Sequence, residues 1–235
     1  MKTIPEEIRS ELGKYADEAV RKSGESFFKE GVKLYGIRNA EVHRMSREFF
    51  KKLPDKSKTA VFGLCDELWR SGYNEEAFIA CNWSFALRKQ FEEKDIFTFE
   101  KWIGNYVTNW ATCDTFCNHT VGEPLMKLTS WIGNLKSWTR SENRWMKRAA
   151  AVSLIIPARR GLFLNDIFAI AETLLDDGDD MVQKGYGWML KAASEAHQKE
   201  VFDFVMKHKP EMPRTSLRYA IEKMPAELRA QAMIK

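Results

Sequence analysis

The sequence predicts an all-α protein. Hydrophobic residues make up 44% of its 235 residues and it has only seven prolines, so a buried core and long uninterrupted helices are both possible. Apolar residues recur at helical spacing, as in Val61, Leu64, Cys65 and Leu68 at i, i+3, i+4 and i+7. No alternating strand of useful length interrupts this pattern. Aromatic residues, 12% of the chain, exclude a mainly disordered protein.

Start and stop signals place the helices in order. The first is expected to open at Pro5, the second to run from Asn39 to just before Pro54, and the third to follow Ser57 and close at Gly72. A helix near Ser141 is expected to end before Pro157. The full set of later segments with helical spacing is 74–91, 95–107, 123–135, 141–156, 163–177, 179–197, 199–208, 213–224 and 225–233.

Helix pairs that repeat roughly every 35 to 45 residues are typical of an α-solenoid of HEAT-like repeats. The repeats are only loosely alike, so an ordinary helical bundle fits the same periodicity. No Ser/Gly-rich linker divides the chain, and we expect one curved domain over residues 1–235.

The N-terminal segment reaches Glu6 and Glu7 without an apolar stretch, so no signal peptide is expected. The longest apolar window, 149–158, is shorter than the roughly 18 residues of a membrane span. The cysteines lack the regular spacing of a disulfide scaffold. A cytoplasmic protein that does not associate with membranes is the simplest interpretation.

Cys113, Cys117 and His119 are residue types that bind zinc. A structural zinc site needs four ligands, and no fourth ligand is evident in the sequence. Two cysteines four residues apart share one helix face, so core packing is the favoured interpretation and a metal site the minor one.

The net charge of +4 hides a polarised chain. Residues 136–160 hold seven bases and one acid, and residues 164–180 hold six acids and no base. Arg144, Lys147 and Arg148 share a helix face that Arg140 extends. This face is either a solvated basic surface or a surface that binds phosphate.

Two aromatic positions indicate a site. Trp110 and Asp114 are four residues apart in a polar, almost uncharged segment, so an acid would lie one helical turn from an indole. Core packing of Trp110 is the alternative. Trp188 lies beside Gly185 and Gly187, which disfavour a helix unless something approaches the backbone closely, and tight helix packing is the simplest cause.

Four motifs in order, YGIRNAEVHRMSREF, NWATCD, WTRSENRWMKRAAAVSLI and KGYGWMLKAAS, resemble the DNA alkylation repair family of HEAT-like-repeat DNA glycosylases. The resemblance extends from about Phe27 to Met224. It implies a concave basic face that binds duplex DNA containing alkylated bases, and excision of cationic N3- and N7-alkylated purines. Ala111 departs from the acid expected in many relatives.

The resemblance also implies roles for individual residues. Asp114 is the expected catalytic residue, which stabilises the oxocarbenium-like sugar and orients water. The residues expected to contact the lesion or its sugar are Trp110 and Trp188; those expected to bind DNA phosphates are Arg148, Lys147, Arg144 and Arg140; and further DNA contacts are expected from Tyr35, Arg38 and His43. A monomeric, monofunctional glycosylase without metal or organic cofactor is expected. The alternative is a non-catalytic HEAT-like module that binds DNA or a protein.

Overall fold

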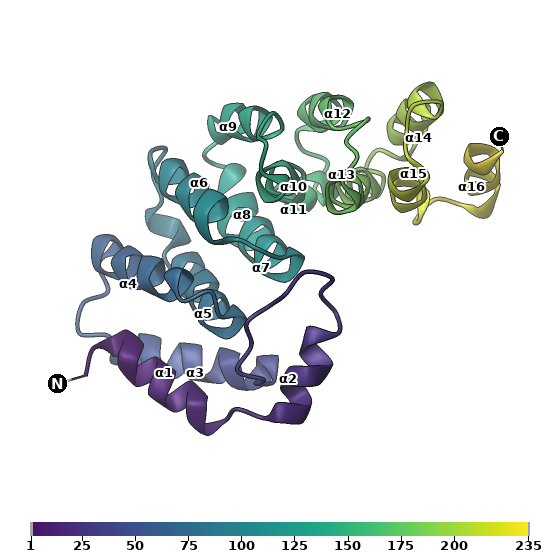
Figure 1. The fold of residues 1–235 in the computed structure, drawn as a ribbon. Coiled ribbons are helices and arrows are strands. Elements are labelled where there is room, and N and C mark those ends of the chain that lie inside the picture. Colours follow the sequence, from purple (N-terminus) through teal and green to yellow (C-terminus); the bar gives the residue numbers. More distant parts are fainter. Residues whose placement is uncertain (1, 235) are drawn as a thin grey trace. The chain divides into compact units, whose positions relative to one another are not determined.

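The computed structural model describes residues 2–234 and confirms the all-α prediction (Figure 1). The described residues contain no strand, only an isolated bridge between Lys33 and Tyr73. None of their helices is long and apolar enough to cross a bilayer. The chain forms two compact units, the first comprising Met1–Phe91 and Asn105–Phe116, the second Glu92–Gly104 and Cys117–Lys235.

The first unit is built around α5. Its helices are α1 (Ile4–Lys14), α2 (Glu18–Glu25), α3 (Asn39–Lys52), α4 (Lys58–Arg70), α5 (Asn74–Ala86), a 3-10 turn (Arg88–Gln90) and α7 (Trp110–Thr115). Helix α5 packs against α3, α4 and α7. The side chain of Ser57 caps α4, and Gly72 follows it with φ of +73°, both at the predicted boundaries. Helix α2 was not predicted, because it is highly charged and buries none of its residues.

The second unit stacks consecutive helix pairs. Its helices are α6 (Asp95–Tyr106, whose last two residues belong to the first unit), α8 (Gly122–Leu125), α9 (Trp131–Trp138), α10 (Arg144–Val152), α11 (Ile155–Arg159), α12 (Leu164–Thr173), α13 (Asp180–Ala193), α14 (Gln198–His208), α15 (Arg214–Ile221) and α16 (Ala226–Met233). Helices α9, α12 and α14 lie in one layer, and α10, α13 and α15 lie in a second (Figure 1). This is the arrangement of HEAT-like repeats.

Two predicted helices differ from the structure. The segment 123–135 forms two helices, α8 and α9, separated by a turn. The helix expected to end before Pro157 ends at Val152, and Pro157 is the third residue of α11. The first turn of a helix tolerates proline because its N–H groups have no partner within the helix, so proline there need not end one.

The two glycines of α13 permit close packing, as the simplest interpretation of the sequence predicted. A Cβ atom on Gly187 would lie 2.7 Å from the Cβ of Tyr219 and 2.8 Å from the carbonyl oxygen of Ser216, in α15. A Cβ on Gly185 would lie 3.2 Å from Cγ of Arg148 in α10. Helix α13 therefore approaches α15 and α10 more closely than an alanine-containing helix could.

We predict that Gly187→Ala lowers the free energy of unfolding by about 1–3 kcal/mol, because the added methyl group overpacks the contact with α15. Urea denaturation measures the change. Gly133→Ala is the matched control, since a Cβ there meets nothing within 4 Å and α9 should gain about 0.5–1 kcal/mol. Equal effects of the two substitutions would contradict the packing explanation.

Candidate functional site

Helix α7 of the first unit carries Trp110 and Asp114. It begins at a fixed point because Asn109, 2% exposed, caps it: its side-chain oxygen accepts hydrogen bonds from the N–H groups of Ala111 and Thr112, both at 3.1 Å. The amide nitrogen of Asn109 donates to Oδ1 of Asn74 at 2.8 Å. Both ends of the Asn109 amide are therefore hydrogen-bonded, and the position of Trp110 follows from the cap.

The indole of Trp110 is partly buried and held on two sides. It stacks on Phe28 with ring centroids 5.5 Å apart, and its Nε1 donates to the carbonyl oxygen of Phe27 at 3.4 Å. The ring of Phe27 itself is 70% exposed. Sequence reasoning did not single out Phe27 and Phe28, although two adjacent phenylalanines in a charged segment are the signal that could have identified them.

Asp114 lies one helical turn after Trp110 and is partly buried. The segment that follows, Phe116–Val121, is a π-helix, a form found frequently at functional sites. Cys113 and Cys117 are fully buried, in agreement with the core-packing interpretation. Within residues 2–234, no group of three or more His, Cys, Asp or Glu residues could hold a metal ion.

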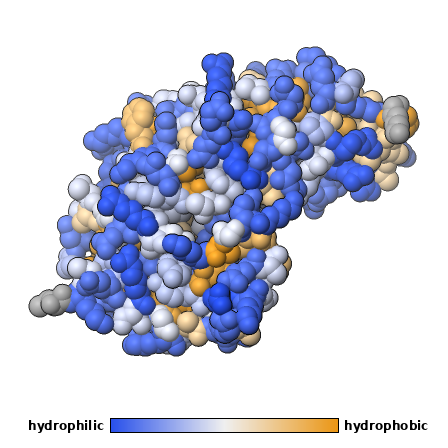
Figure 2. Space-filling model, in the orientation of Figure 1, coloured by the Kyte–Doolittle hydropathy of each residue, from blue (hydrophilic) through white to orange (hydrophobic). Residues whose placement is uncertain are grey.

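A cavity of about 620 Å³ lies beside Trp110 in the first unit. We call it the aromatic cavity; its lining includes Phe28, Arg38, Asn74, Glu75, Phe78 and Trp110. Figure 2 shows a hydrophobic, orange patch bordered by hydrophilic surface on this unit. A volume of several hundred Å³ with mainly apolar walls and a few polar groups is typical of small-molecule sites.

The three residues named as further DNA contacts have different environments. Tyr35 donates to Oε1 of Glu76 at 2.8 Å, and burial together with this hydrogen bond raises the pKa of the phenol. His43 is exposed and its Nδ1 lies 3.1 Å from Nδ2 of Asn82. Arg38 is exposed and forms no ion pair with any described residue. Of the three, only Arg38 lines the aromatic cavity.

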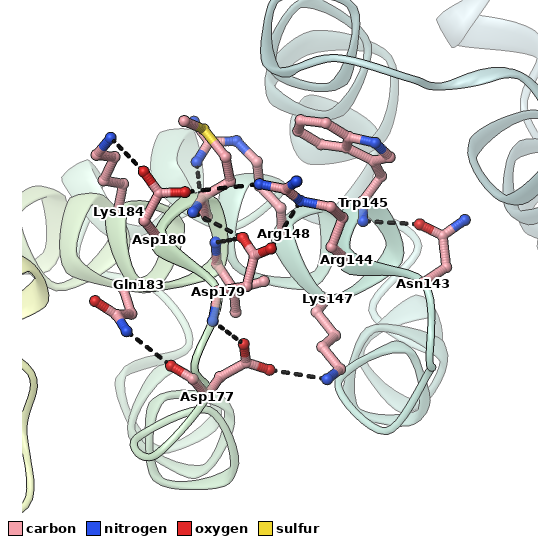
Figure 3. Close-up of polar contacts among 12 residues, drawn as sticks. Asn143, Arg144, Trp145, Lys147, Arg148, Asp177, Asp179, Asp180, Gln183 and Lys184 are labelled. Carbon is pink, nitrogen blue, oxygen red and sulfur yellow. Dashed lines mark hydrogen bonds and ion pairs between the residues drawn. The ribbon is translucent and has the colours of Figure 1, made fainter. Parts of the chain in front are cut away.

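The basic face predicted on α10 is largely paired with acids (Figure 3). Nε of Arg144 lies 2.8 Å from Asp179, and Nζ of Lys147 lies 2.8 Å from Asp177. The hydrogen bond to Asp177 raises the pKa of Lys147. In addition, Lys136 pairs with Asp166 at 2.6 Å. The acidic run that follows the basic segment in the sequence thus folds back onto it and neutralises much of it.

Arg148 is buried, whereas Arg140 is exposed. Arg148 is 5% exposed, and its Nη1 donates to the carbonyl oxygen of Met181 at 2.5 Å, next to Gly185 in α13. Arg140 is exposed, and its side chain forms no hydrogen bond or ion pair within the described part of the chain. Trp188 is partly buried in α13. Arg148, Arg140 and Trp188 belong to the second unit, whereas Trp110 and Asp114 belong to the first.

Stacked helix pairs and an indole–carboxylate pair on a capped helix define a helical-repeat protein with a candidate acidic active-site residue. The family model described as DNA alkylation repair enzyme matches residues 8–224. The chain therefore belongs to the DNA alkylation repair enzyme family, as the motifs predicted.

A solved structure described as a predicted DNA alkylation repair enzyme from Enterococcus faecalis shares this fold with a TM-score of 0.79. The likeness covers 89% of this chain and 97% of that one, at 13% sequence identity. No curated protein matches the chain.

We predict that Lys147→Met lowers the free energy of unfolding at pH 7 by up to about 1 kcal/mol. The folded-state pKa of Lys147 is raised, so the stabilisation is complete below the unfolded-state pKa of about 10.4 and is lost as pH rises through the folded-state pKa. The difference between wild type and variant should therefore shrink in urea denaturation above about pH 10.

The control is Lys127→Met, which removes an exposed lysine without an ion pair to any described residue and should show no such pH dependence. A deficit of Lys147→Met that is unchanged at high pH would show that packing of the lysine stem, and not the ion pair, is responsible.

Proposed function

We propose that the protein is a DNA glycosylase that hydrolyses the N-glycosidic bond of cationic N3- or N7-alkylated purines in duplex DNA. The observation that carries this proposal is the capped helix α7, which holds Trp110 and Asp114 one turn apart inside the segment that matches the repair family. The two reactants of this hydrolysis are the damaged DNA and water.

The chemistry suits a single carboxylate. An N3- or N7-alkylated purine already carries a positive charge, so the base is a good leaving group and needs no general acid. The charge that develops in the transition state lies on the deoxyribose, as in glycoside hydrolysis. Asp114, when ionised, would stabilise this oxocarbenium-like sugar and orient the attacking water.

Trp110 and Trp188 would make the enzyme selective for positively charged bases. A cation over an indole face gains about 0.5–2 kcal/mol, which a neutral purine does not receive. The stacking of Trp110 on Phe28 and the hydrogen bond of its Nε1 reduce the freedom of the ring before substrate arrives. The resemblance to the repair family gives Trp188 the same role, attraction of a cationic base, and its own alanine variant tests this.

Basic side chains that have no existing ion pair can bind a DNA phosphate most readily. Arg38 and Arg140 are exposed and lack ion pairs within residues 2–234, so each could bind a phosphate without breaking an existing contact. Arg144 and Lys147 would have to exchange an aspartate for a phosphate, and buried Arg148 would have to leave the carbonyl of Met181. Arg38 and Arg140 are therefore the stronger candidates for the first phosphate contacts.

We predict that Asp114→Asn slows release of 7-methylguanine from methylated duplex DNA by about 10²–10³-fold, because the amide cannot oppose the positive charge on the sugar. Single-turnover kinetics measures the rate. Asp203→Asn, which changes an exposed carboxylate paired with Lys199 on α14, should keep the wild-type rate. Wild-type release by Asp114→Asn would disprove the proposed mechanism.

We further predict that Trp110→Ala and Trp188→Ala each slow release of 7-methylguanine by about 2- to 30-fold through loss of the cation–π attraction. Trp110→Phe should lose less, because an aromatic face remains over Phe28. Phe97→Ala removes an exposed ring from α6 and serves as the control. Full activity of both tryptophan variants would remove these two residues from the site.

A further inference from the structure

The aromatic cavity contains a buried carboxylate that is only half satisfied. Glu75 is 3% exposed, and its Oε1 accepts hydrogen bonds from the N–H groups of Gly36 at 2.9 Å and Ile37 at 3.2 Å. Its Oε2 is buried and accepts no hydrogen bond from any described residue. Buried carboxylate oxygens are costly when left unpaired, so a ligand that brings an N–H or N–H₂ donor would bind here favourably.

The walls around Glu75 suit a flat ring. Phe28 and Trp110 are stacked with an interplanar angle of 24°, and Phe78 also lines the cavity. Asn74 adds an amide beside the carboxylate. Aromatic walls with adjacent amide and carboxylate groups match a nucleobase, which offers two π-faces and an edge of N–H donors and acceptors.

The polar side of the cavity also suits an anion. Arg38 both lines the cavity and reaches solvent, and it has no ion-pair partner among residues 2–234. It immediately precedes α3, a helix that begins without a side-chain cap. The first N–H groups of such a helix and a free guanidinium attract phosphate together.

We propose that the aromatic cavity binds one purine nucleotide, with its base against Phe28, Phe78 and Trp110, an N–H group of the base donating to Oε2 of Glu75, and its phosphate at Arg38. Because Oε2 of Glu75 lacks a donor, it favours a base with strong N–H donors, such as an N7-methylated guanine, whose positive charge makes its N–H groups better donors. The nucleotide is either free or part of the substrate DNA. Only the second source rests on the proposed function.

The first experiment tests binding without catalysis. 7-Methylguanosine 5′-monophosphate is titrated into the full-length protein, and the indole N–H resonance of Trp110, assigned by its loss in Trp110→Phe, is followed by NMR. We expect this resonance to shift with saturation, and guanosine 5′-monophosphate, which lacks the methyl group and its positive charge, to bind more weakly. A Trp110 resonance unchanged at millimolar nucleotide would overturn the proposal.

Glu75→Gln tests the unpaired oxygen, because the substituted side chain keeps one oxygen for Gly36 and Ile37. We expect nucleotide affinity to fall by about 10- to 100-fold. Glu76→Gln is the matched control: Glu76 is equally buried in α5, its carboxylate is bonded to Tyr35 and Arg9, and it does not line the cavity. Equal losses in the two variants would contradict the role of Glu75.

Arg38→Ala tests the phosphate without disturbing the core, since Arg38 is exposed. It should weaken binding of the nucleotide about tenfold and leave binding of the nucleoside, 7-methylguanosine, unchanged. Equal effects on nucleotide and nucleoside would contradict the placement of the phosphate.

The source of the nucleotide is decided with duplex DNA containing one N7-methylguanine. If the cavity receives a nucleotide of the DNA, Glu75→Gln weakens duplex binding as well; if the nucleotide is free, duplex affinity stays at the wild-type value. These binding measurements are independent of the rate of Asp114→Asn. If the wild-type protein binds no nucleotide and Asp114→Asn is inactive, the cavity is rejected and the proposed function is retained. If the wild-type protein binds the nucleotide and Asp114→Asn keeps the wild-type rate, the cavity is retained and the proposed function is rejected.

Discussion

Three consecutive buried polar residues at the start of α5 hold the first unit together. Asn74 accepts the amide of Asn109 and so anchors α7, while Glu75 accepts the N–H groups of Gly36 and Ile37. Glu76 accepts from Tyr35 and pairs with Arg9 of α1 at 3.1 Å. One turn of helix thereby fixes three other segments of the chain. Because buried polar groups are costly unless they are hydrogen-bonded, each of these contacts is specific in geometry as well as favourable in energy. The orientation of Trp110 is a consequence of this arrangement.

In the second unit, close helix packing depends on small residues. Gly185 makes room for Arg148 and Gly187 for the backbone of α15, so α13 packs closely against a neighbour on each of two sides. The buried guanidinium of Arg148 ties α10 to the first turn of α13 through the carbonyl of Met181. This hydrogen bond gives Arg148 a structural role that is distinct from any contact with DNA.

The sequence was sufficient for the fold class, most helices and the placement of Trp110 and Asp114 one turn apart on a helix, because these follow from local signals: apolar periodicity, capping residues and four-residue spacing. Asn74, Glu75 and Glu76 were not foreseen, since an acidic first turn is typical of a solvated helix start and burial depends on segments far away in the chain. The pairing of the basic segment with acids could not be predicted for the same reason. A count of charges along the chain does not show that Asp177 and Asp179 return to Lys147 and Arg144.

The acidic segment acts as a counter-ion that is covalently part of the protein. Mobile counter-ions are released when phosphate binds, and this release makes DNA affinity fall with ionic strength. Asp177 cannot diffuse away from Lys147. A phosphate that bound this lysine would release its own condensed cation but leave Asp177 to attract another, so the net release of mobile ions would be small. For the proposed DNA binding, the salt dependence should accordingly report the bases that have no ion pair within residues 2–234, such as Arg38 and Arg140, and be shallower than the 37 lysines and arginines of the chain suggest.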